Sequence, residues 1–125
     1  ALAGRVFKIR SDGRFIRDYV YISDIVNGYI LLAQKMKSHR LFGQVFNLSD
    51  ENPLSVLELV RLIYRMVGLK PQCMILGQAK YEIRKQYMSA AKARKILGWR
   101  PRQTLDEGLR QTILWYQRNL DYVQR

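Results

Sequence analysis

The residues of this chain that are best suited to chemistry are basic, and they favour binding over catalysis. The guanidinium of Arg17 carries a planar fork of N–H donors that matches phosphate oxygens. Its neighbour Asp18 leaves other interpretations open, an internal ion pair or a solvated strand position. An arginine such as Arg17 can therefore contact an anionic ligand.

Residues for metal binding or nucleophilic catalysis are scarce. The chain has one cysteine, Cys73, and one histidine, His39, too few for a four-ligand zinc site. His39 lies in a basic stretch where we expect exposure to solvent, which does not suit a catalytic base. The lone cysteine also fits a reducing compartment, so we expect a cytoplasmic protein. No metal site and no catalytic residue are predicted.

The charge balance is strongly basic, with 22 Lys and Arg against 10 Asp and Glu and a net charge of +12. These charges are spread along the chain without a long block, which is typical of a solvated surface. An anionic ligand or an acidic partner also fits, and so does a nucleic-acid-binding module centred on the helix with Lys92, Arg94 and Lys95. No apolar run is long enough to span a membrane, so no membrane partner is expected.

Four amphipathic helices are expected to position these residues. They cover residues 24–36 with Ser23 as N-cap, 56–67 with Ser55, 90–97 with Ser89, and 105–120 with Thr104. The second and fourth open with capping boxes, in which Ser55 pairs with Glu58 and Thr104 with Glu107. Trp99 and Trp115 lie on apolar faces and are predicted to be buried.

Short strands are expected between the helices, at residues 6–9, 15–21, 44–48 and 73–76. The first two flank the turn Ser11-Asp12-Gly13, whose composition suits a hairpin. The predicted fold class is α/β, four helices with a few short strands and no complete sheet of its own. We expect residues 1–125 to form one domain that is part of a larger fold.

Four segments, taken together and in order, resemble one family. They are RSDGRFIRDYVYISDI at residues 10–25, VFNL at 45–48 followed by SV at 55–56, KARKILGWRP at 92–101, and TLDEGL at 104–109. This order is similar to that of extended short-chain dehydrogenase/reductases of the NAD-dependent epimerase/dehydratase family, which act on nucleotide sugars. The stretches IRSDG at 9–13 and EIRKQ at 82–86 look closest to the CDP-glucose 4,6-dehydratase-like branch.

The resemblance implies a lyase or isomerase that uses NAD(P) to remove hydride from a hexose, assisted by a Tyr-x-x-x-Lys pair. This chain has no glycine-rich cofactor loop, and Tyr81 with Lys85 falls in the family's substrate-binding region, so it is not that pair. We therefore expect the C-terminal, sugar-nucleotide-binding portion without the N-terminal Rossmann half. Alone it should bind no cofactor, catalyse nothing and self-associate through the apolar surface that the missing half would cover.

The resemblance also points to five residues, four of them with a role. Arg17 would contact the diphosphate, and Tyr19, two positions along the same strand, would border the nucleotide. Glu82 would accept hydrogen bonds from the ribose hydroxyls, and Val56 would lie near the base. Gln86 matches the dehydratase-like pattern without an assigned role.

Alternatives stay open for these residues. Val56 also suits a core position, Tyr19 a half-buried aromatic, and Glu82 a surface ion pair with Lys85 or Arg84. Relatives place an arginine against the diphosphate three residues before Glu82, where this chain has Ala79. Two interpretations stay open: Lys80 or Arg84 replaces it, or this branch has no second cation there.

Overall fold

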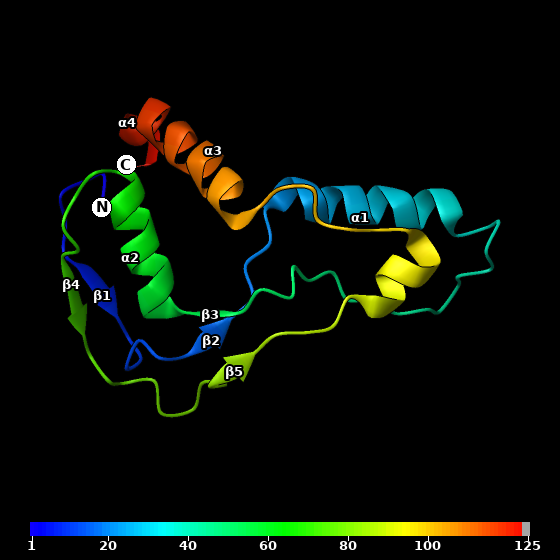
Figure 1. Cartoon of the computed structure of the whole chain (residues 1–125), viewed down its shortest axis with the longest axis horizontal. Helices are drawn as coiled ribbons and strands as arrows, with labels where there is room; N and C mark the ends of the chain where they lie inside the picture. The colour runs from blue at the N-terminus through cyan, green and yellow to red at the C-terminus, as the bar shows by residue number, and fades with distance from the viewer. Residues whose placement is uncertain (124–125) are drawn as a thin grey trace. The chain divides into compact units, whose positions relative to one another are not determined.

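A computed structural model describes residues 1–123, which divide into two compact units (Figure 1). The first unit combines Ala1–Arg17, Leu54–Gln86 and Leu109–Arg125, and the second combines Asp18–Pro53 and Tyr87–Gly108. Among the described residues, no helix is long and apolar enough to cross a membrane. The predicted mixture of helices and short strands is confirmed.

The first unit contains two small sheets. Strand β1 (Phe7–Ile9) pairs in parallel with β4 (Cys73–Ile75). Strand β2 (Ile16–Arg17) lies between β3 (Leu54–Ser55), which is antiparallel to it, and β5 (Lys85–Gln86), which is parallel. Each strand has two or three residues, so the sheets depend on neighbouring segments for stability.

Helix α2 (Val56–Met66) covers these strands and supplies most of the core of the first unit. Val60 and Tyr64 are buried with Ile9 of β1. The Tyr64 hydroxyl donates to the Gln72 carbonyl at 3.1 Å, which satisfies its polar end inside the core. Helix α3 (Leu105–Arg118) begins in the second unit and continues into the first, and α4 (Leu120–Val123) belongs to the first.

Both predicted capping boxes are present. The Ser55 hydroxyl accepts from the Glu58 amide at 3.2 Å, and the Glu58 carboxylate accepts from the Ser55 amide at 2.6 Å. Thr104 and Glu107 make the same reciprocal pair at the start of α3. Each box satisfies amides that have no partner within the helix.

The second unit is built around Trp99, which is fully buried as predicted. Its indole N–H donates to the Asp24 carbonyl of α1 (Ile22–Lys35) at 2.8 Å. A short helix, η1 (Ala93–Leu97), packs beside it, and Lys35 of α1 donates to the Leu97 carbonyl at 2.9 Å. These contacts join α1 and η1 around one indole.

Several local predictions are wrong. Residues 6–9 and 15–21 form no hairpin, because β1 pairs with β4 and β2 with β3 and β5. Residues 44–48 form no strand, and helix α1 begins at Ile22 with Tyr21 as its N-cap, so Ser23 is inside the helix. Trp115 is 51% exposed instead of buried. The spacing of apolar residues predicts an apolar helix face, but it does not show whether that face is buried.

Candidate functional site

The turn before strand β2 fixes the position of Arg17. The Ser11 hydroxyl accepts from the Gly13 amide at 3.1 Å, and Gly13 has a positive φ of 79°. A Cβ at Gly13 would lie 2.5 Å from Cγ of Leu57 in α2. The turn therefore requires glycine for its backbone conformation and for the close approach of the helix.

The N-terminus of α2 is joined to the same segment by backbone hydrogen bonds. The Val56 amide donates to the Phe15 carbonyl at 3.1 Å, and the Leu57 amide donates to the Gly13 carbonyl at 3.0 Å. These bonds attach the first turn of the helix to the chain that leads into β2. The predicted site residues Val56 and Arg17 are thus held in one unit.

Arg17 lies opposite Gln86 in the parallel pairing of β2 and β5. Residues directly opposite one another in a sheet project to the same face, so the two side chains are neighbours. The Arg17 guanidinium donates to the Ile16 carbonyl at 2.8 Å and lies 5.8 Å from the centroid of the Phe15 ring. These two contacts hold a half-buried cation in place.

Glu82 joins this face through two arginines. Its Oε1 lies 2.5 Å from Nη2 of Arg10, and its Oε2 lies 3.8 Å from Nη2 of Arg17. The first contact is a charge-assisted hydrogen bond, and the second is an ion pair only. The alternative partners of Glu82, Lys85 and Arg84, do not take this role in the described structure.

Arg10 is the residue that our sequence reasoning missed. It lies in the IRSDG stretch that contributes to the family resemblance. Its contact with Glu82 joins two residues that are 72 positions apart in the sequence. No local pattern contains that information.

Val56 is half-buried and packs against the core of Ile9, Val60 and Tyr64. This supports the core interpretation without testing contact with a ligand. Tyr19 is also half-buried, but strand β2 ends at Arg17. The prediction that Tyr19 shares a strand face with Arg17 is therefore wrong, and Tyr19 belongs to the second unit.

The second unit has its own charged cluster, which stabilises structure. The Asp18 carboxylate accepts from the Ser49 hydroxyl and from the Glu51 amide. Glu51 forms an ion pair with Arg94 and accepts from the Ala90 amide at 3.0 Å. The Arg94 and Ser89 hydrogen bonds lower the pKa of Glu51 to about 2.

Asp50 lies next to Glu51, but the pKa of its carboxyl is shifted in the opposite direction. Burial, followed by repulsion from Asp18 and Asp24, raises the pKa of its carboxyl. Three acids close together can suggest a metal site, but no group of three or more His, Cys, Asp or Glu residues in residues 1–123 could hold a metal ion. We assign this cluster no catalytic chemistry.

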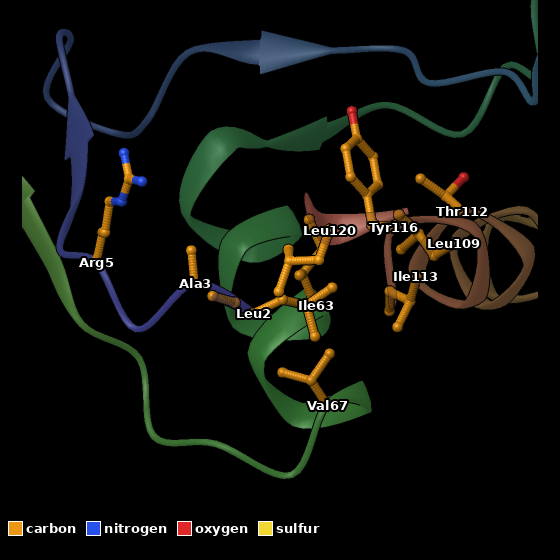
Figure 2. Close-up of a pocket in the computed structure, with 11 residues that line it drawn as sticks. Leu2, Ala3, Arg5, Ile63, Val67, Leu109, Thr112, Ile113, Tyr116 and Leu120 are labelled. Atoms are coloured by element: carbon orange, nitrogen blue, oxygen red, sulfur yellow. The ribbon is translucent and has the colours of Figure 1, made fainter. Parts of the chain in front are cut away.

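A pocket of about 430 Å³ in the first unit lies apart from the predicted residues. It is lined by the N-terminal segment, α2, α3 and α4, and Figure 2 shows Ile63 and Val67 of α2 facing Ile113 and Leu120. Its lining is mainly aliphatic, and Arg5 stands at one side. None of Arg17, Glu82 or Gln86 lines it, so it is an apolar groove and not the candidate site.

Comparison with known proteins identifies the family. The family model described as GDP-mannose 4,6 dehydratase matches residues 4–112. The chain belongs to this family. The predicted membership among extended short-chain dehydrogenase/reductases is therefore confirmed, while the CDP-glucose branch stays a prediction.

Two curated relatives of this dehydratase-family chain are enzymes of UDP-sugars. UDP-glucuronate 4-epimerase from Thermodesulfobacterium geofontis is 30% identical over 94% of this chain and 35% of the relative. UDP-glucuronic acid decarboxylase 1 from Xenopus tropicalis is 30% identical over 98% of this chain and 28% of the relative. The chain therefore spans about a third of the length of the relatives that it matches.

Solved structures have the same fold. UDP-glucose 4-epimerase from Thermotoga maritima, solved with UDP-glucose, superposes with a TM-score of 0.83 at 29% identity, over 95% of this chain and 37% of that one. dTDP-glucose 4,6-dehydratase from Bacillus anthracis, solved with NAD, superposes with a TM-score of 0.83 at 22% identity. The match covers 97% of this chain and 37% of that one. The second comparison supports the fold alone.

NAD is the cofactor named with the Bacillus anthracis structure and with other similar structures. A dinucleotide is usually held by a glycine-rich turn between a strand and the N-terminus of a helix. In this chain α1 and α2 begin directly after Tyr21 and Ser55, without such a turn. Neither of these two helix starts offers NAD such a turn.

Proposed function

We propose that this chain is the nucleotide-sugar-binding portion of an NAD-dependent nucleotide-sugar 4,6-dehydratase or epimerase. The supporting observation is the β3-β2-β5 sheet, which places Arg17 beside Gln86 and within ion-pair distance of Glu82. A fixed guanidinium next to a carboxylate and an amide offers donors for a diphosphate and acceptors for hydroxyl groups. Nucleotide sugars contain both.

In this proposal the chain binds and orients substrate. Arg17 contacts the diphosphate, Glu82 accepts hydrogen bonds from the ribose, and Gln86 extends the polar face. Val56 borders the nucleotide. Anchoring the nucleotide fixes where the hexose lies, which contributes to catalysis by orientation. The hydride chemistry belongs to a cofactor-binding portion that this sequence does not contain, so the 125 residues alone should be inactive.

The test is a titration of the chain with UDP-glucose and CDP-glucose, followed by backbone amide chemical shifts. We expect the largest changes around Arg17, Glu82 and Gln86, with dissociation constants near the millimolar range because one wall of the cleft is lacking. Arg17→Gln should weaken binding by about tenfold, since it removes a charge-assisted contact.

Arg65→Gln is the matched control, because Arg65 is an exposed arginine of the same unit on α2. It removes one charge without altering the candidate site and should leave binding unchanged. Equal losses in the two variants would show a general effect of charge. No shift changes at Arg17 or Glu82 with millimolar sugar nucleotide would refute the proposed function.

A further inference from the structure

Two arginines, Arg10 just after strand β1 and Arg17 in strand β2, converge on one carboxylate at the candidate site. Each oxygen of Glu82 faces one guanidinium, Arg10 at 2.5 Å and Arg17 at 3.8 Å. Two cations around one anion leave an excess positive charge. The structure thus shows an arrangement that already holds an anionic group between these two side chains.

The two arginines are held in different ways. The Arg17 side chain is 23% exposed and is fixed by the Ile16 carbonyl and the Phe15 ring. The Arg10 side chain is 73% exposed, whereas its backbone is fixed because its carbonyl accepts from the Gln78 amide at 2.6 Å. Arg10 therefore has a fixed backbone and an exposed guanidinium that can move to contact another anion.

The Arg10–Glu82 pair is not needed for the fold. Exposed ion pairs contribute little to stability, because water screens the attraction and both long side chains lose freedom. Exchanging the carboxylate for another anion costs Arg10 little. A phosphate accepts a bidentate contact from guanidinium and carries at least as much charge, so it competes well.

This chain also lacks the arginine expected three residues before Glu82, where Ala79 stands. Among the described residues, the ion pairs of Glu82 are with Arg10, at Oε1, and with Arg17, at Oε2. Arg10 therefore places a second guanidinium beside the carboxylate that Arg17 approaches. A diphosphate has two phosphoryl groups, so one guanidinium for each is a chemically balanced arrangement.

We propose that Arg10 is a second diphosphate-binding residue and that Glu82 occupies the two arginines when no substrate is bound. This inference depends on the proposed function of the same site. On binding, the diphosphate replaces the carboxylate on both guanidiniums. Glu82, released from Arg10, can then accept hydrogen bonds from the ribose hydroxyls. Diphosphate binding therefore makes both the guanidiniums and the carboxylate available to the substrate.

The test compares ligands that differ by one phosphate. Calorimetric titrations are made with UDP and UMP, and with CDP and CMP. The proteins compared are the unmodified chain, the variants Arg10→Gln and Arg17→Gln, and the control Arg14→Gln. Arg14 is an exposed arginine of the same stretch. Arg10→Gln should weaken diphosphate binding by about tenfold and leave monophosphate binding unchanged. Arg14→Gln should change neither.

The outcomes separate the two proposals. If Arg17→Gln weakens diphosphate binding and Arg10→Gln does not, the role of Arg10 is wrong and the proposed function stands. Equal losses for monophosphate and diphosphate in Arg10→Gln also overturn that role, since they show a general charge effect. If the unmodified chain binds no diphosphate, both proposals fail.

A second variant tests the role given to Glu82. Inorganic pyrophosphate has no ribose, so Glu82→Gln loses nothing in its binding and frees both arginines. We expect Glu82→Gln to bind pyrophosphate several-fold more tightly than the unmodified chain does. The ratio of UDP affinity to pyrophosphate affinity should be lower in Glu82→Gln than in the unmodified chain. Weaker pyrophosphate binding by Glu82→Gln would overturn the competition between carboxylate and phosphate.

Discussion

Gly28 of helix α1 is packed closely against the side chains of Leu48 and Trp99. A Cβ there would lie 2.5 Å from Cδ1 of Leu48 and 3.1 Å from the indole nitrogen of Trp99. Alanine favours a helix by about 1 kcal/mol over glycine, but overpacking a core costs about 1–3 kcal/mol. We expect Gly28→Ala to lower the free energy of unfolding by about 1 kcal/mol, measured by urea denaturation.

Gly108→Ala in α3 is the control for that prediction. Its Cβ would approach the Tyr21 side chain at 3.0 Å, a tight contact but a less severe one. Gly108→Ala should therefore destabilise less than Gly28→Ala, because the helix preference offsets more of the strain. The opposite order would show that Leu48 and Trp99 yield easily, and that the second unit is packed more loosely than its buried indole indicates.

At the same scale, the sequence predicts three residues of the candidate site but not Arg10. Arg17, Glu82 and Gln86 were chosen by family resemblance, and the structure brings these three together. Arg10 was missed because its partner is distant in sequence and its exposure resembles that of an ordinary surface arginine. Residue type and spacing do not show which surface charges share a carboxylate.

At the scale of the element, two neighbouring acids should act oppositely on the helical segment that ends in η1. Glu51 accepts from Ala90 and Arg94 of that segment, and its pKa is lowered from 4.5 to about 2. Its stabilising effect is therefore complete above pH 4.5 and is lost as pH falls toward 2. Glu51→Gln should lower the melting temperature at pH 7 and have no effect near pH 2.

Asp50→Asn is the matched variant, one position away. Burial and the nearby Asp18 and Asp24 raise the pKa of Asp50, so its carboxylate opposes folding once pH exceeds the unfolded value of 3.8. Asp50→Asn should raise the melting temperature at pH 7 and have little effect near pH 2. Melting curves from pH 2 to pH 7 check both signs, and a shift of the same sign at pH 7 would contradict this account.

Elements with their own local signals were predictable, and long-range strand pairing was not. The box of Ser55 and Glu58 marks the start of α2 within four residues, and the structure has it. The turn Ser11-Asp12-Gly13 has the composition of a hairpin turn, yet it connects β1 of one sheet to β2 of the other. Strands of two or three residues take their partners from distant segments, so turn chemistry alone cannot assign them.

At the scale of the molecule, the net charge of +12 and the exposed apolar side chains have opposite effects on association. Large apolar residues are exposed in both units, including Val45 at 75% and Ile83 at 62%. Like charge keeps copies of the chain apart at low salt, and screening shortens that repulsion as salt rises. Self-association through apolar contacts should therefore strengthen with salt.

The nucleic-acid alternative predicts the opposite dependence, because binding to phosphates by counterion release weakens steeply with salt. Light scattering at 50 mM and 500 mM NaCl should show a mass that rises with protein concentration, and more so at the higher salt. Duplex DNA binding should stay weak at both. A monomer under every condition, together with DNA binding that falls steeply with salt, would reject self-association and favour a nucleic-acid-binding module. Lys92→Gln with Lys95→Gln would then localise it, since these lysines lie on the helical segment predicted to carry that activity.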